Sequence, residues 1–386
     1  MKIGITCYPT YGGSGAIATE LGMALASRGH EVHFITYAQP FRLPHFLERV
    51  YFHEVEIVRY PLFEHSPYPL SLAAAMHEVA EREQLDILHV HYAIPHATSA
   101  WIAKEMLGDR HGLKIITTLH GTDITLVGQE RSFEQITRFS IERSDGITAV
   151  SDFLRRETVT HFGINSERIE VIPNFVDLNV YDRSRFADHR NALAPEGEKL
   201  VMHISNFRSV KRVRDVVRTF DRIRRSIPAR LVFVGDGPDR PEAAAEADAR
   251  GLTNEDIVFL GKQDSVAELL ACADLFLLPS ESESFGLSAL EAMASGVPVV
   301  ATATGGLTEV VAEGVGGHLL PVGDVEGMAE ASLTILADQA SWSRYSEGAR
   351  EAATAFRVEE VVPMYERYYE RVLNQPSGSD MRGGAR

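Results

Sequence analysis

Short apolar runs alternate with longer amphipathic stretches along this chain. In the first half the strand-like runs are KIGITCY, EVHFITY, DILHVHY, KIITTLH and GITAVS, and helical patterns such as AIATELGMALASRG and LSLAAAMHEVAERE lie between several of them. An order of strand, helix and strand favours a parallel sheet with helices on both faces. We therefore predict an α/β fold built from Rossmann-like, doubly wound parallel sheets.

The alternation restarts after a polar stretch that follows RIEVIPNFVD. The later strand-like runs are LVMHISN, ARLVFVGDG, DIVFLG, DLFLLPS, VPVVAT and GGHLLPV. A length of 386 residues also allows about two domains. We place a first domain at 1–178 and a second at 179–357. We expect a C-terminal helix, about 358–374, to pack back on the first domain, and the Gly-rich tail, 375–386, to be disordered.

The edge at which the strands end decides where a ligand binds in such folds. Open α/β sheets hold ligands just beyond the carboxyl ends of their strands. Two sheets that each present this edge predict a ligand cleft between the domains. The loops after GITCY, TTLH, HISN, FVGDG and LLPS should surround it.

Charge and hydropathy exclude several classes of partner. A formal net charge of −16 argues against nucleic acid or an anionic membrane as the main partner. No run approaches the ~18 apolar residues of a membrane span, and MKIGITCYPT does not resemble a signal peptide. We expect a cytoplasmic protein.

The two cysteines, Cys7 and Cys272, cannot form a disulfide framework, and we favour a buried structural role for Cys7 over a nucleophile.

A glycine-rich turn follows the first strand in PTYGGSGAIATELG. Gly12, Gly13 and Gly15 precede a helix, where glycines let backbone approach a ligand and free N–H groups favour an anion. The spacing is not that of the dinucleotide fingerprint. A tight turn without a ligand explains the same glycines.

A basic run, FRSVKRVR, follows the first strand of the second half. It holds Arg208, Lys211, Arg212 and Arg214. A solvated helix start is the plain explanation, but Arg208 and Lys211 are placed to face the predicted cleft. Cations on one side and glycines on the other suit a diphosphate.

Two carboxylates stand eight residues apart in ESESFGLSALEAMASGVPVVAT. Glu283 lies in the loop after a strand, and Glu291 falls inside the helix that follows. Carboxylates accept hydrogen bonds from vicinal hydroxyls, and the helix start at Gly286 and Leu287 suits a phosphate. The alternative is that Glu283 caps the helix and Glu291 is solvated, although the apolar neighbours of Glu291 argue against that. We leave Glu281 as a surface residue.

ESFGLSALEAMASGVPVV resembles the Glu-x7-Glu motif of the retaining GT-B glycosyltransferases of family 4, which use nucleotide sugars. GGSGAIATELGMALASRGHEVHFIT, AVSDFLRRE, VIPNFVD, FVGDGPD and ATATGGLTEVV resemble that family in the expected order, to about Leu373. GITCYPTYGGSGAIATELG, AQPFRL, HYAIPHA, TTLHGTDIT and HISNFRSVKRVRDV are similar to the branch that acts in bacillithiol biosynthesis. That branch implies UDP-N-acetylglucosamine as donor and L-malate as acceptor.

The resemblance implies a role for each motif residue. Glu283 would hold hydroxyls of the donor sugar, Glu291 the ribose of UDP and Lys211 the diphosphate, while His120 would lie beside the sugar at the reacting centre. The backbone amides that would hold the distal phosphate are those of Gly15, Gly286 and Leu287. The family usually has an arginine five residues before the phosphate lysine. Here that donor-site position is Asn206, so we assign Arg208 to the diphosphate instead.

The acceptor would be a small dianion that needs hydrogen-bond donors in the first half. Our candidates are Tyr92, Thr122 and Arg138, with Ser14 behind them. An arginine within a helical stretch such as SFEQITRFSIERSDG normally faces solvent, which weighs against Arg138.

Neither a metal nor another cofactor is implied. His89, His91 and His96 can be imagined as a zinc site, but strand-end histidines lining a polar cleft are the interpretation we favour.

The predicted reaction retains the configuration at the anomeric carbon. Retention by two carboxylates needs a nucleophile close beneath the reaction centre, and the sequence offers none. We therefore expect front-face attack, with His120, Lys211, Arg208 and Glu283 as the catalytic set.

Three alternatives stay open. They are another small acidic acceptor such as inositol phosphate, an epimerase that uses Asp123, and a non-catalytic nucleotide-sugar binder. The oligomeric state, which could be a homo-oligomer, also stays open.

Overall fold

The computed structural model describes residues 1–10, 12–57, 65–108 and 111–375. The chain forms two compact units. Unit 1 comprises Met1–Pro173 together with the C-terminal stretch from Glu359, and unit 2 comprises Asn174–Val358. The first unit therefore ends slightly before the expected position 178. All of the predicted disordered tail beyond Gln375 lies outside the described residues.

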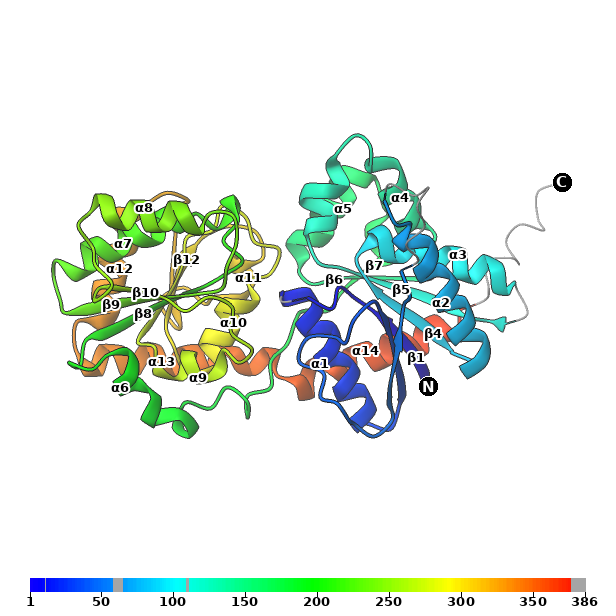
Figure 1. Cartoon of the computed structure of the whole chain (residues 1–386), viewed down its shortest axis with the longest axis horizontal. Helices are drawn as coiled ribbons and strands as arrows, with labels where there is room; N and C mark the ends of the chain where they lie inside the picture. The colour runs from blue at the N-terminus through cyan, green and yellow to red at the C-terminus, as the bar shows by residue number, and fades with distance from the viewer. Residues whose placement is uncertain (11, 58–64, 109–110, 376–386) are drawn as a thin grey trace. The chain divides into compact units, whose positions relative to one another are not determined.

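Unit 1 contains a seven-stranded parallel sheet in the order β3-β2-β1-β4-β5-β6-β7, with helices on both faces (Figure 1). The strands are β1 (Lys2–Thr6), β2 (Glu31–Thr36), β3 (Val50–Glu54), β4 (Ile87–His91), β5 (Lys114–Leu119), β6 (Gly146–Ala149) and β7 (Ile169–Val171). The α-helices are α1 (Gly13–Ser27), α2 (Tyr68–Glu83), α3 (Thr98–Leu107), α4 (Glu134–Glu142), α5 (Asp152–Phe162) and α14 (Val358–Leu373). Short π or 3-10 turns are η1 (Ala93–Ala97), η3 (Thr122–Leu126), η4 (Val127–Gln129) and η5 (Ser166–Arg168).

Unit 2 contains a six-stranded parallel sheet in the order β10-β9-β8-β11-β12-β13. The strands are β8 (Lys199–Ile204), β9 (Ala229–Val234), β10 (Ile257–Phe259), β11 (Leu275–Leu278), β12 (Val299–Thr302) and β13 (Gly317–Leu320). The α-helices are α6 (Arg190–Leu193), α7 (Val213–Arg224), α8 (Arg240–Ala249), α9 (Ala267–Cys272), α10 (Leu287–Ala294), α11 (Leu307–Val310), α12 (Val325–Leu336) and α13 (Gln339–Ala353). The 3-10 turns are η6 (Arg183–His189), η7 (Ser209–Lys211) and η8 (Thr354–Phe356).

The predicted doubly wound α/β class is confirmed in both units. Central strands of such sheets are buried on both faces, so they appear in the sequence as continuous apolar or small-residue runs. Strands β4 and β5 are buried at every position, which is why they could be recognised in the sequence as short apolar runs. We did not predict β3 or β7. Strand β3 is an edge strand whose Tyr51 and Phe52 are exposed, and β7 has only three residues.

Each sheet forms a core with the helices packed on it. In unit 1, apolar residues of α2 and α3 pack against β2, β4 and β5. In unit 2, apolar residues of α7, α8 and α12 pack against β8, β9 and β11. Burial of aliphatic and aromatic side chains on this scale is the main favourable contribution to folding. The two cores therefore hold the carboxyl edges of both sheets in place.

The C-terminal helix α14 belongs to unit 1. The Tyr368 hydroxyl accepts the Ile147 N–H at 2.6 Å and donates to the Ile147 carbonyl at 3.0 Å. The Tyr369 hydroxyl lies 2.7 Å from His89 Nδ1, beneath the middle of the sheet. Both tyrosines are buried. Residues that follow unit 2 in the sequence are therefore part of the core of unit 1.

The structure bears on two further expectations, that no segment spans a membrane and that Cys7 is a buried structural residue. In the described residues, no helix combines the length and the apolar character that a membrane span requires. Cys7 is fully buried, and burial raises the pKa of its thiol to about 12. Since the thiolate is the reactive form, Cys7 fits the structural role that we favoured.

Replacing Tyr368 by Phe tests the attachment of α14. We expect the free energy of unfolding to fall by about 1–3 kcal/mol, because two buried hydrogen bonds to a strand are lost. Urea denaturation would measure the change. Tyr51→Phe is the matched control, since Tyr51 is 49% exposed and its hydroxyl is accessible to water. Equal unfolding midpoints for the two variants would contradict the assignment.

Candidate active site

In unit 1, three predicted acceptor residues meet at the carboxyl edge of the sheet. Tyr92 follows β4, and its hydroxyl lies 2.8 Å from the Ser14 hydroxyl on α1. Burial raises the pKa of Tyr92 to about 12, and hydrogen bonds to Ser14 and Thr122 oppose that rise. The parallel sheet thus brings together side chains from the loops after β1, β4 and β5.

The backbone of Tyr92 is strained. Its φ is +88°, in the region that bulky L-residues rarely adopt. Holding a residue there costs about 1–3 kcal/mol, and such strain is concentrated at functional sites. The conformation places the Tyr92 ring 5.4 Å from the His120 ring and 5.5 Å from the Tyr8 ring. An aromatic and imidazole wall therefore lies beside the three hydroxyls.

His120 follows β5 and pairs with a histidine of the neighbouring strand. Its Nε2 lies 2.8 Å from His91 Nδ1, and the two rings are stacked with centroids 5.0 Å apart. Burial lowers the pKa of His120 to about 3 and also lowers the pKa of His91 well below its ordinary value. Both imidazoles are therefore neutral at physiological pH.

The tautomer of His120 follows from its partner. His91 is fully buried, and within the described residues its Nε2 has no hydrogen-bond partner. A buried N–H without a partner is rarer than a buried acceptor without one, so we infer that His91 carries its proton on Nδ1. His91 then donates to His120 Nε2. His120 in turn carries its own proton on Nδ1, where it serves as a hydrogen-bond donor rather than a base.

The zinc interpretation of the strand-end histidines gains no support. His89 uses both ring nitrogens, one 2.7 Å from the Tyr369 hydroxyl and the other 2.7 Å from the Thr118 hydroxyl. His96 Nδ1 donates to the His91 carbonyl at 2.6 Å. These histidines are satisfied mainly by the protein. The expected absence of a metal stays a prediction.

Asp123 is buried and braces two loops. Its Oδ2 accepts the Ala93 N–H at 2.9 Å, and its Oδ1 accepts the N–H groups of Gly121 at 3.0 Å and His120 at 3.3 Å. Burial raises the pKa of this carboxyl, and the backbone bonds oppose the rise. A carboxylate held by three amides fixes the loop that carries His120. This arrangement fits a structural role better than the catalytic acid of an epimerase.

Two other predicted site residues, Arg138 and Gly15, do not belong to the hydroxyl cluster. Arg138 is on the exposed face of α4, and its Nε donates to Glu142 at 3.0 Å. This is an ordinary i,i+4 surface pair. Gly15 is buried in α1, where an added Cβ would come within 2.5 Å of the Tyr8 carbonyl oxygen. Close packing of the loop after β1 therefore requires this glycine whether or not its amide meets a phosphate.

In unit 2, the predicted sugar carboxylate and the predicted phosphate cation contact each other. Lys211 Nζ donates to Glu283 Oε1 at 2.5 Å, and the Ser280 hydroxyl donates to the same oxygen at 2.8 Å. Both charged side chains are largely buried, with 18% and 11% exposed. The charges of the two residues therefore balance one another.

The rest of the basic run divides into paired and exposed cations. Arg212 pairs with Asp215 at 2.6 Å, and Arg214 pairs with Glu242 at 3.1 Å. Arg208 is exposed, as is Asn206. The loop that carries them packs closely on the loop after β9. An added Cβ at Gly237 would come within 2.0 Å of the Asn206 carbonyl oxygen.

Helix α10 carries the other predicted donor residues. Gly286 precedes it with φ +95°, and an added Cβ there would meet Leu307 at 2.4 Å. Leu287 is the first helical residue, so its N–H belongs to the first turn, whose amides lack intrahelical partners. Glu291 lies inside the helix and is 6% exposed, as its apolar neighbours indicated. Its Oε1 accepts the Tyr181 hydroxyl at 2.6 Å.

Sequence reasoning missed Tyr181 and Ser280. Tyr181 is 110 positions from Glu291 and lies in the polar stretch that we treated as a junction. Ser280 was part of the quoted LLPS loop but had no assigned role. Spacing carries no signal for such contacts, because only the fold brings these side chains together.

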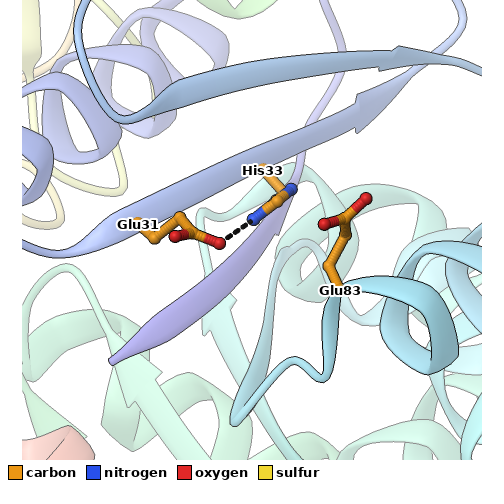
Figure 2. Close-up of side chains that lie close together, drawn as sticks. All are labelled: Glu31, His33 and Glu83. Atoms are coloured by element: carbon orange, nitrogen blue, oxygen red, sulfur yellow. Dashed lines mark hydrogen bonds and ion pairs between the residues drawn. The ribbon is translucent and has the colours of Figure 1, made fainter.

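One further cluster contains possible metal ligands within the described part of the chain. Ligand atoms of Glu31, His33 and Glu83 lie within 4.8 Å of one another (Figure 2). Lys2 Nζ lies 3.2 Å from Glu31, and Arg82 Nε lies 2.8 Å from Glu83, so two cations already balance the two carboxylates. The cluster is at the amino ends of β1 and β2, the opposite edge from Tyr92 and His120. We therefore assign it a structural role.

Comparisons with known proteins agree with the motif pattern. The model described as Glycosyltransferase Family 4 matches residues 11–180, and the model described as Glycosyl transferases group 1 matches 184–352. N-acetyl-alpha-D-glucosaminyl L-malate synthase of Bacillus anthracis is 50% identical over 97% of this chain and 97% of its own length. D-inositol 3-phosphate glycosyltransferase of Kribbella flavida is 29% identical over 89% of this chain and 87% of its own.

Solved structures with the same fold are more distant in sequence. HepE of Anabaena in complex with UDP and glucose is 21% identical, with a TM-score of 0.79 over 97% of this chain and 100% of that one. Sucrose-phosphate synthase of Thermosynechococcus elongatus is 20% identical, with a TM-score of 0.78 over 96% of this chain and 98% of that one. At this identity the likeness establishes the fold alone.

The low pKa and the inferred tautomer of His120 can be measured together. In protein labelled with ¹⁵N-histidine, we expect His120 to keep the Nδ1–H pattern unchanged from pH 5 to pH 8, since its pKa lies near 3 and the ring stays neutral above it. Titration of free histidine in the same buffer is the control. An Nε2–H pattern for His120, or titration near pH 6.5, would contradict the assignment.

Proposed function

The chain belongs to the glycosyltransferases of family 4, and from this membership we propose that it transfers N-acetylglucosamine from UDP-N-acetylglucosamine to the hydroxyl of L-malate. The two doubly wound units are those of the GT-B fold. The observation that carries the proposal is 50% identity, over nearly the full length of both chains, to a relative named N-acetyl-alpha-D-glucosaminyl L-malate synthase. This reaction is the first step of bacillithiol biosynthesis.

Inositol phosphate is the competing acceptor. Relatives named D-inositol 3-phosphate glycosyltransferase are 26–29% identical over 89–95% of this chain. Both acceptors are small and acidic, so they require similar donors. The much higher identity to the malate relative favours L-malate.

The donor would bind unit 2. Its diphosphate would draw Lys211 away from Glu283, because a diphosphate carries more negative charge than one carboxylate. Glu283 would then accept hydrogen bonds from sugar hydroxyls, and exposed Arg208 would add a second cation. The first-turn amides at Gly286 and Leu287 suit the distal phosphate. The ion pair with Glu283 balances the charge of Lys211, and the donor would replace this pair with its own contacts to both side chains.

The acceptor would bind unit 1 through hydroxyl groups. Ser14, Tyr92 and Thr122 meet at one point and provide hydrogen-bond donors for a carboxylate. Arg138 would have to leave its surface pair with Glu142 to take part. We therefore rank the three hydroxyl residues above Arg138 as acceptor contacts.

The proposed chemistry is front-face displacement with retention. The malate hydroxyl oxygen bonds to the anomeric carbon as the bond from that carbon to the diphosphate oxygen breaks, and the hydroxyl proton passes to the departing phosphate. Lys211, Arg208 and the α10 amides stabilise the charge that develops there. His120, neutral and protonated on Nδ1, donates a hydrogen bond beside the sugar. No metal or other cofactor enters this proposal.

The acceptor can be identified by product mass. With UDP-N-acetylglucosamine, we expect release of UDP and a malate glycoside when L-malate is added. Inositol phosphate should react far more slowly, and a chelator should not change the rate. An epimerase would convert the donor without an acceptor, and a binder would release no UDP. Preferred reaction with inositol phosphate would overturn the malate proposal.

A comparison of two substitutions can separate the role of Lys211 from that of the other cations in the basic run. Lys211→Ala should lower kcat by about 10²–10³, because charge on the leaving diphosphate loses its nearest cation. Arg214→Ala is the matched control, since Arg214 lies in the same run but pairs with Glu242 at the surface. Near-normal turnover of Lys211→Ala, or an equal loss in both variants, would contradict the assignment.

A further inference from the structure

The Tyr181 hydroxyl lies against the carboxylate of Glu291. The oxygen–oxygen distance is 2.6 Å, which is typical of a hydroxyl that donates to an ionised carboxylate. Tyr181 is 3% exposed and Glu291 is 6% exposed. A buried carboxylate is costly unless hydrogen bonds stabilise its charge. The tyrosine therefore both stabilises the ionised form of Glu291 and limits the directions its oxygens can take.

Arg350 of α13 fixes the position of this tyrosine. Its guanidinium donates to the Tyr181 carbonyl at 2.6 Å and to the Leu178 carbonyl at 2.9 Å. It also donates to the carbonyl of Ala294, the last residue of α10. Carbonyls at a helix end need such partners. One planar side chain thus joins the tyrosine segment to the helix that carries Glu291.

The segment before Tyr181 has its own local order. The Tyr181 N–H donates to the Asp177 carbonyl at 3.3 Å, and the Asn179 N–H donates to the Asp177 carboxylate at 2.8 Å. These bonds close a compact turn. Together with Arg350, the turn leaves the tyrosine ring little freedom relative to α10.

We propose that Tyr181 is a positioning residue that holds Glu291 in the orientation in which it accepts the ribose hydroxyls of the nucleotide. The inference rests on the proposed function, which places a UDP-sugar in unit 2. A carboxylate has about four acceptor positions, so a bond from one tyrosine is compatible with bonds from a vicinal diol. Tyr181 itself need not touch the ligand. Its effect is on binding of the pentose rather than on the chemical step.

The test compares UDP with 2′,3′-dideoxyuridine diphosphate, which lacks both ribose hydroxyls. By isothermal titration calorimetry, Tyr181→Phe should bind UDP about tenfold more weakly than the wild type, as expected for a lost hydrogen bond to a charged group. Affinity for the dideoxy ligand should stay nearly unchanged. In the assay, KM for the donor should rise while kcat changes little.

The control is Tyr345→Phe. Tyr345 is buried in unit 2, and its hydroxyl lies 2.8 Å from His318 Nε2. This variant removes one buried hydroxyl without touching Glu291, so UDP affinity should equal that of the wild type. If Tyr181→Phe does not fold, 3-fluorotyrosine at position 181 keeps the ring and makes the hydroxyl a stronger acid. As a stronger donor to Glu291, this residue should make UDP bind more tightly than it does to the wild type, with affinity for the dideoxy ligand unchanged.

The outcomes distinguish failure of the Tyr181 inference from failure of the proposed function. A wild-type protein that binds neither ligand would overturn the proposed function, and the inference with it. If the wild type prefers UDP but Tyr181→Phe keeps that preference, only the inference falls. It also falls if Tyr181→Phe loses affinity for both ligands equally, because that result indicates general damage to the unit. An unchanged UDP affinity for the fluorotyrosine protein would likewise overturn it.

Discussion

Parallel strand pairing is the constraint on which the rest of the structure depends. Because every strand in each sheet runs the same way, the loops that follow the strands all emerge at one edge. Ser14, Tyr92 and Thr122 are far apart in sequence, yet they share one hydrogen-bonded cluster for this reason. The same constraint in unit 2 brings the basic loop after β8 to Glu283 after β11. The chemistry at both edges is therefore a product of sheet topology.

Charges near these edges are matched before any ligand arrives. Lys211 and Glu283 neutralise each other in a largely buried position, and Tyr181 stabilises the buried carboxylate of Glu291. An isolated buried charge would be far more costly. In unit 1, burial keeps His91 and His120 neutral, so this edge of the sheet presents hydroxyl groups rather than imidazolium ions. The charged side chains at these edges therefore already have partners within the protein.

The parts of the fold that sequence reasoning found share one property. Strands β4 and β5, and the helix around Glu291, are buried on all sides, so their apolar character is visible in the sequence. Strand β3 was not predicted because it is an edge strand with exposed side chains, so its sequence lacks a buried apolar run. The ion-pair partners of the basic run could not be assigned from the sequence, since any of several carboxylates can pair with an arginine equally well. The Tyr181–Glu291 contact joins residues 110 positions apart, and no local pattern encodes it.

The return of α14 to unit 1 has a consequence for how the protein is made. Synthesis runs from the N-terminus, so the seven-stranded sheet is complete in sequence long before Tyr368 and Tyr369 leave the ribosome. Until then, His89 and the backbone of Ile147 lack the hydroxyl groups that satisfy them in the finished protein. Unit 2, in contrast, is continuous and is translated in full before α14. Unit 2 is therefore complete in sequence before unit 1, although most of unit 1 is translated first.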